Sequence, residues 1–118
     1  MKKSLGFACL AIAAPALAAP LPKPASFAIC GACHKVEAGA PSGVGPNLWQ
    51  VGGRTSGTLD GYDYSPAMKA AKIKWTKAEL VSFISGPQAR VPGTKMAFGG
   101  IKNPADASAV ADYLLSLK

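Results

Sequence analysis

Helical periodicity dominates the apolar pattern in the second half of the chain. Near the C-terminus, apolar side chains recur with the i, i+3, i+4 and i+7 spacing of a single helix face, at Val110, Tyr113, Leu114 and Leu117. A second such face lies upstream, at Leu80, Phe83 and Ile84. No segment alternates between apolar and polar residues as a half-buried strand would. The pattern therefore predicts an all-α protein.

Local sequence signals predict where two of the helices begin. Ser65-Pro66 combines an N-cap residue with proline at the first helical position, which predicts a helix that extends to about Lys72. Asn103-Pro104 repeats this arrangement and predicts the start of the last helix. A short helical segment is also expected over residues 24–36. In total we expect three or four short helices.

A capping box at Thr76 and Glu79 predicts one further helix start, and Gly86-Pro87 ends that helix.

Two long connections separate the predicted helices. Gly- and Pro-rich stretches occupy residues 37–64 and 87–100, and loops of this length in a compact domain are usually functional. Few short helices and two long loops make a thin core, which a bulky apolar cofactor would fill.

The N-terminal segment is typical of an export signal. Two lysines precede an apolar stretch over residues 5–17, and Ala16-Leu17-Ala18 has the small-x-small pattern of a signal-peptidase site. The stretch is too short for the alternative, an uncleaved membrane anchor. We therefore expect a cleaved secretory signal over residues 1–18 and one periplasmic domain over residues 19–118.

Charge and cysteine content narrow the possible functions. The 118-residue chain has a formal charge of +7, and loss of Lys2 and Lys3 with the signal lowers it to +5. This surplus suits acidic protein surfaces or anionic membranes, whereas dispersed lysines in an exported chain disfavour nucleic acid as a partner. Cys9 lies in the expected signal, so the exported domain keeps Cys30 and Cys33, too few for a disulfide-stapled fold.

The sequence CGACH at residues 30–34 admits three interpretations. A thiol oxidoreductase uses C-x-x-C at a helix start, but in a βαβ context that this pattern lacks. A zinc site needs four ligands, and Cys30, Cys33 and His34 supply three in a chain with no other histidine. C-x-x-C-H is also the attachment signature of haem c. Two thiols one helical turn apart reach the two porphyrin vinyl groups and place the histidine beneath the iron, so we favour haem.

A second axial ligand must come from a residue other than His34, the only histidine. Met68, Met96 and a water molecule are the candidates. Met68 falls in a predicted helix, where a methionine commonly fills a gap in the core. Met96 lies in the Gly/Pro-rich sequence VPGTKMAFGG, whose backbone can bend over a flat ligand. We therefore expect Met96 to bind the iron, which raises the reduction potential and closes the site to oxygen or peroxide.

Blocks of sequence across residues 27–118 follow the order and spacing of a known family: FAICGACHKVEAG, VGPNLWQVGGR, GYDYSPAMK, KWTKAEL, VPGTKMAFGGIK and ADYL. On these blocks the chain resembles the class I cytochromes c, and is similar to bacterial cytochrome c2 and mitochondrial cytochrome c. The resemblance implies a small all-α fold whose short helices wrap around one covalent haem c. It also implies that the N- and C-terminal helices cross, with Phe27 packed against Tyr113 and Leu114.

The resemblance implies a role for each residue around the haem. Cys30 and Cys33 form the thioether bonds, His34 is the proximal iron ligand and Met96 is the distal ligand. The carbonyl of Pro46 accepts the Nδ1–H of His34, which fixes the imidazole and strengthens it as a donor.

More distant residues also receive roles from the resemblance. Arg54, Tyr64 and Trp75 would bond the haem propionates, whose burial is costly without donors. The alternative for this group is an ordinary surface arginine with two core aromatics. Thr94 would bond near the distal side of the haem, and Phe98 would cover the haem edge.

The sequence departs from the mitochondrial pattern in two places. Phe83 and Met68 replace a tyrosine and an asparagine near the distal ligand, so we expect a drier distal pocket and a shifted reduction potential. Ile29, Gln88 and Ala89 occupy positions where mitochondrial proteins ring the exposed haem edge with lysines. We therefore expect electron transfer to depend less on ionic strength.

The resemblance implies a soluble, monomeric one-electron carrier whose iron cycles between Fe(III) and Fe(II), and not an enzyme. Cytochrome bc1 is the usual donor, and a terminal oxidase, peroxidase or photosynthetic reaction centre is the usual acceptor, each met by transient docking. A haem peroxidase or oxidase is the enzyme alternative, which would need an open distal position and a distal acid–base residue. A thiol oxidoreductase is the other alternative, which would need free thiols.

Overall fold

The computed structural model describes residues 4–10 and 18–118, and within them it is helical. The elements in chain order are the 3-10 turn η1 (Ala25–Phe27), then α1 (Ala28–Gly31), α2 (Pro66–Ala71), α3 (Lys77–Ser85), α4 (Pro87–Arg90) and α5 (Pro104–Leu115). No strand occurs among the described residues, where an isolated bridge joins Thr55 and Lys74. The expected all-α fold is confirmed.

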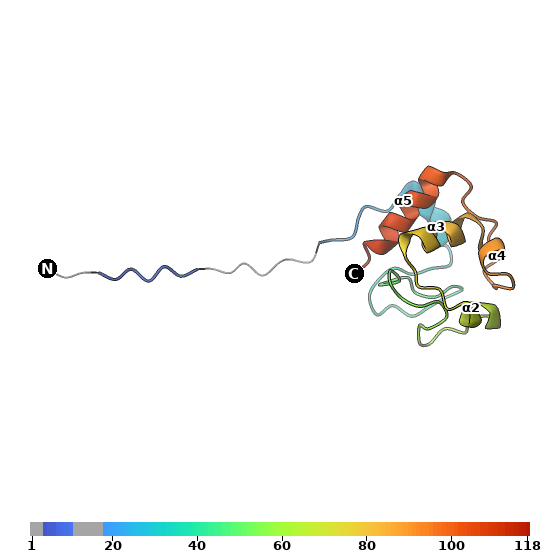
Figure 1. Ribbon diagram of the computed structural model, residues 1–118, viewed down its shortest axis with the longest axis horizontal. Coiled ribbons are helices and arrows are strands. Elements are labelled where there is room, and N and C mark those ends of the chain that lie inside the picture. The colour runs from blue at the N-terminus through green and yellow to red at the C-terminus, as the bar shows by residue number, and fades with distance from the viewer. Residues whose placement is uncertain (1–3, 11–17) are drawn as a thin grey trace.

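The expected export signal lies partly outside the described residues, because residues 1–3 and 11–17 are not among them. Residues 4–10 lie away from the helical body, and Leu5, Phe7 and Leu10 are all strongly exposed (Figure 1). No helix in the described ranges has both the length and the apolar character needed to cross a bilayer.

The last helix is the centre of the apolar core. In Figure 1, α5 lies across α3 and the N-terminal turn, and it contacts both. Its expected stripe is confirmed, because Val110, Tyr113 and Leu114 are buried, and so is Leu117 just beyond the helix end. The rings of Phe27 and Tyr113 meet edge-on with centroids 5.0 Å apart. This aromatic pair joins the N-terminal turn to α5, as the family resemblance implied.

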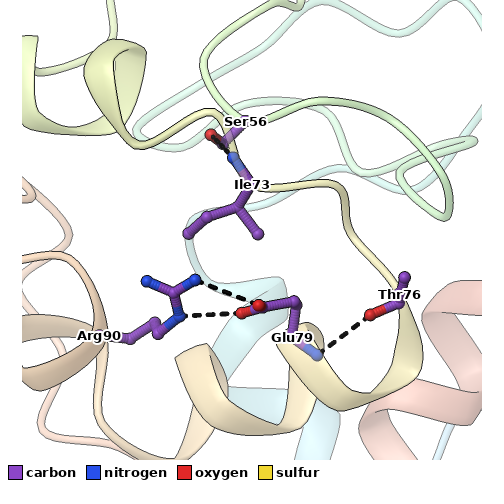
Figure 2. Close-up of polar contacts among 5 residues, drawn as sticks. All are labelled: Ser56, Ile73, Thr76, Glu79 and Arg90. Carbon is purple, nitrogen blue, oxygen red and sulfur yellow. Dashed lines mark hydrogen bonds and ion pairs between the residues drawn. The ribbon is translucent and has the colours of Figure 1, made fainter.

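The predicted helix starts are confirmed by their hydrogen bonds. Ser65 Oγ accepts from the Met68 amide at 3.1 Å, and Asn103 Oδ1 accepts from two amides in the first turn of α5. Thr76 Oγ1 accepts from the Glu79 amide at 3.3 Å (Figure 2). The capping box is only half formed, because the Glu79 carboxylate binds Arg90 instead.

Two predicted boundaries were wrong. The first helical segment ends at Gly31 instead of Val36, because backbone groups just beyond it bond to the following loop: Gly45 N–H donates to Cys33 O and Leu48 N–H donates to Lys35 O, each at 2.9 Å. The expected loop over residues 87–100 also begins with a helix, α4. Pro87 starts it because proline at the first helical position has φ preset and no N–H to satisfy.

The long loop over residues 37–64 is ordered by buried polar side chains. Asn47 donates from Nδ2 to Glu37 O and Ala40 O, at 2.9 and 2.7 Å. Ser56 Oγ donates to Met68 O at 3.2 Å and accepts from the Ile73 amide at 2.9 Å (Figure 2). No buried side-chain nitrogen or oxygen lacks a partner in the described part of the chain. These bonds replace the secondary structure that the loop does not have.

Candidate functional site

The CGACH sequence occupies one helical turn at the end of α1. The Cys33 and His34 amides both donate to Cys30 O, at 3.1 and 2.9 Å, so the turn continues through the motif. Residues three apart on such a turn share a face. The two cysteines are not joined in a disulfide; Cys33 is exposed and Cys30 is partly buried. This arrangement fits two bonds to one edge of a porphyrin.

The other interpretations of the cysteines have less support. Burial raises the pKa of Cys30, the neighbouring Cys33 raises it further, and a backbone hydrogen bond opposes both effects. A thiol oxidoreductase requires a lowered thiol pKa. Among the residues that the structure describes, no three His, Cys, Asp or Glu side chains gather as a metal site. A zinc site would need four ligands.

The His34 ring is held by a hydrogen bond at one of its two nitrogens. Its Nδ1 lies 2.8 Å from Pro46 O, and because a carbonyl can only accept, Nδ1 carries the proton. Burial lowers the pKa of His34, while the bond to Pro46 acts in the opposite direction. The neutral imidazole therefore keeps the lone pair of Nε2, the form that binds metals.

Gly45 is packed against the His34 ring, a contact that the sequence analysis missed. A Cβ atom at this position would lie 2.7 Å from Nδ1 and 2.9 Å from Nε2, and closer still to Cε1. Only glycine leaves room for the imidazole here. Gly45 and Pro46 therefore act on the same ring, one by leaving space and the other by accepting its proton.

Met96 lies in residues 91–98, which we call the distal segment. Thr94 is buried, and its Oγ1 accepts from the Met96 amide at 3.4 Å. The Phe98 amide donates to Met96 O at 3.0 Å, which bends the segment around Met96. Met96 is partly buried against the apolar core, and Phe98 is partly exposed.

The predicted propionate group is brought together by the backbone. Trp75 N–H donates to Arg54 O at 3.0 Å, and Trp75 is buried. The Arg54 guanidinium donates to Asn47 O at 3.0 Å and lies near enough to Tyr64 to interact with it electrostatically. Burial raises the pKa of Tyr64, and Arg54 opposes the rise. Burial also lowers the pKa of Arg54, which remains a cation because its ordinary pKa is so high.

A set of contacts between two loops was also missed by the sequence analysis. The Tyr62 hydroxyl donates to Val44 O at 2.8 Å, and its ring lies edge-on to Tyr64 with centroids 4.8 Å apart. The Lys95 ammonium lies 4.6 Å from the centre of the Tyr62 ring and also donates to Asp63 O. These contacts link the long loop to the distal segment.

The two departures from the mitochondrial pattern near the distal ligand, Met68 and Phe83, both lie in the core. Met68 and Phe83 are buried, and the Phe83 ring lies 5.2 Å from that of Trp75. Neither side chain brings a strong polar group to this region.

Comparison with known proteins assigns the family. The cytochrome c family model matches residues 24–118. The chain is 44% identical over 95 residues to cytochrome c2 iso-2 of Magnetospirillum molischianum, covering 80% of this chain and 97% of that protein. It is 47% identical over 90 residues to cytochrome c-550 of Nitrobacter winogradskyi, covering 76% and 83%.

A solved structure agrees with these relatives. Cytochrome cH from Methylobacterium extorquens superposes with a TM-score of 0.71 at 41% identity, over 75% of this chain and 89% of that one. The described fold and the spacing of Cys30 and Cys33 fit the cofactor of this group. This chain belongs to the cytochrome c family: it is an electron carrier and not an enzyme, with one covalently attached haem c.

Proposed function

We propose that the chain is a soluble periplasmic one-electron carrier whose haem is held by thioethers at Cys30 and Cys33, with His34 and Met96 as iron ligands. The main supporting observation is the 2.8 Å hydrogen bond between His34 Nδ1 and Pro46 O, because it leaves Nε2 as the metal-binding atom. When bound, the haem supplies an iron that accepts and releases one electron.

The protein's task is to hold two ligands in place in both oxidation states. Gly45 and Pro46 fix the proximal ring from two directions. On the other side, Thr94 and Phe98 fold the backbone around Met96. A neutral thioether ligand favours the reduced iron and fills the coordination position that an oxidase or peroxidase would leave open.

Three further residues would receive the haem propionates. Arg54 supplies a positive charge, while the Tyr64 hydroxyl and the Trp75 indole N–H supply neutral donors. Phe98 would cover the haem edge, and Thr94 would bond near the distal side. Together these groups give the negative propionates donors in a partly buried setting, where unpaired charge is costly.

The export signal and the partners are part of the same proposal. Removal of residues 1–18 would release residues 19–118 to the periplasm as a monomer. Transient docking to cytochrome bc1 and to a terminal oxidase, peroxidase or photosynthetic reaction centre would follow. Ile29 is 57% exposed, which suits an apolar contact with a partner protein. The mass of protein recovered from the periplasm tests the cleavage site, and an intact N-terminus would contradict it.

Absorption spectra of the matured protein test the ligands. We expect sharp low-spin c-type bands on reduction with dithionite, a weak near-red band in the ferric form, and no change with carbon monoxide at neutral pH. A high-spin spectrum, or one that changes with carbon monoxide, would show that Met96 does not hold the iron.

Paired variants separate the two candidate methionines. Met96→Ala should remove the near-red band and admit carbon monoxide, because the distal position then opens. Met68→Leu keeps a buried apolar side chain of similar size and should retain the band. Loss of the band in Met68→Leu but not in Met96→Ala would assign the ligand to Met68 instead.

A further inference from the structure

Gln88 makes an unusual contact with the backbone of the distal segment. It lies in α4, and its side-chain amide donates from Nε2 to two carbonyl oxygens: Thr94 O at 3.0 Å and Met96 O at 3.2 Å. An amide NH₂ group carries two donors, so one side chain can satisfy both carbonyls. The two acceptors flank Lys95, so Gln88 bridges the part of the backbone that carries Met96.

The distal segment is joined to α4 at its first residue, because Val91 is buried and its amide donates to Pro87 O at 2.9 Å. Beyond Val91 the backbone bonds of the segment are internal: the Thr94 amide donates to Val91 O, and the Phe98 amide donates to Met96 O, both at 3.0 Å. Internal bonds shape a segment without fixing it to the rest of the protein. Beyond Val91, polar attachment therefore relies on side-chain contacts with other elements.

Two side chains supply polar attachments on different sides. Lys95 extends from the segment and donates to Asp63 O in the long loop. Gln88 reaches the segment from α4. Lys95 belongs to the segment itself, whereas Gln88 belongs to α4, which ends at Arg90 just before the segment begins. The Gln88 side chain therefore starts from backbone outside the segment.

The backbone of α4 is held in place on both sides of Gln88. Pro87, the preceding residue, is fully buried. Arg90, two residues later, forms two bonds to the Glu79 carboxylate of α3, at 2.8 and 3.1 Å (Figure 2). The Arg90 amide also donates to Gly86 O at 3.0 Å. The short helix thus presents the Gln88 amide from a position anchored to the core.

We propose that Gln88 is a positioning residue for Met96: its amide ties the Thr94 and Met96 carbonyls to α4 and keeps the distal segment closed over the iron. The proposal rests on Met96 being the ligand, as proposed above. A net hydrogen bond typically changes an equilibrium by about twofold to tenfold, and Gln88 is exposed enough for water to compete. Losing both bonds should therefore raise the population of the opened segment by about tenfold.

Imidazole binding to the ferric holoprotein measures that population. Imidazole binds iron only where Met96 has left it, so its apparent affinity at fixed neutral pH scales with the opened fraction. Gln88→Leu removes the donors without introducing a new metal ligand. Ala89→Leu adds the same side chain at the adjacent exposed position of α4 and is the matched control. Gln88→Glu keeps the size and polarity, but an ionised carboxylate cannot donate.

We expect Gln88→Leu and Gln88→Glu to bind imidazole about tenfold more tightly than wild type, with Ala89→Leu unchanged. The denaturant midpoint for global unfolding should move little, because the effect is confined to the distal segment. If Gln88→Leu and Gln88→Glu bound imidazole with the same affinity as wild type and Ala89→Leu, while wild type showed a normal near-red band, the positioning role alone would be overturned. A wild-type protein without the near-red band would overturn the proposed ligation and this role together.

Discussion

Replacing Gly45 by alanine tests whether the proximal ring is held by space as well as by a hydrogen bond. The added methyl group would lie 2.7 Å from His34 Nδ1 and 2.9 Å from Nε2. Heavy atoms that are not bonded settle at about 3.5–4.0 Å, so the ring must move by roughly 1 Å. A displacement of that size away from Pro46 would lengthen the 2.8 Å bond to Pro46 O to about 3.8 Å, beyond hydrogen-bond range.

The expected cost has two parts. Overpacking a well-filled site costs about 1–3 kcal/mol. Weakening or losing the hydrogen bond to Pro46 adds about 0.5–1.5 kcal/mol. We therefore expect Gly45→Ala to lower the free energy of unfolding of the holoprotein by about 1.5–4.5 kcal/mol. The reoriented imidazole should also perturb the ferric spectrum.

The assay is denaturant unfolding of the ferric holoprotein, followed by far-UV circular dichroism and by the near-red band. Gly43→Ala is the matched control in the same loop, because its Cβ would meet only Cys33 O, at an ordinary 3.8 Å. We expect the control to change stability by less than about 0.5 kcal/mol. If Gly45→Ala matched the control in both stability and spectrum, the steric argument about His34 would be wrong.

Three further predictions concern the surface and the loops. Hydrogen bonding from Arg90 lowers the pKa of Glu79, so the stability that this pair adds is present above the ordinary pKa of 4.5 and is lost as pH falls below it. Glu79→Gln should therefore flatten the acid limb of a stability-against-pH curve, and an unchanged limb would contradict the pairing. Tyr62→Phe should lower the free energy of unfolding by about 0.5–1.5 kcal/mol through loss of its bond to Val44 O, measured by denaturant titration, where no change would contradict it. Electron transfer with cytochrome bc1 should fall less steeply with ionic strength than it does for a mitochondrial cytochrome c, and equal slopes would contradict the expected docking surface.

The sequence predicted those features that depend on neighbouring residues. The caps at Ser65 and Asn103 were correct because each bonds to amides two or three residues away. The stripe of α5 was correct because one helix face follows directly from spacing. The spacing within CGACH likewise predicts how its cysteines lie, since a single helical turn separates the two sulfur atoms.

Features that depend on distant residues were not predictable in this way. The half-formed capping box is an example: Thr76 caps α3 as expected, but the Glu79 carboxylate goes to Arg90, eleven positions along the chain. Helix α4 has four residues, too few to show a periodic pattern. The contact of Gly45 with the His34 ring has no signature in the sequence, because a glycine in a loop has many other uses.

The two sides of the site therefore differ in how they are held. The proximal side is held by backbone of one ordered loop, since Gly45 and Pro46 both contact the His34 ring. Beyond Val91, the polar attachments of the distal segment come from side chains of exposed residues, Gln88 and Lys95. Segments with few fixed backbone bonds open at lower free energy than a packed core. With His34 and Met96 as the proposed iron ligands, we therefore expect Met96 to leave the iron before His34 does, while α3, α5 and the N-terminal turn stay folded.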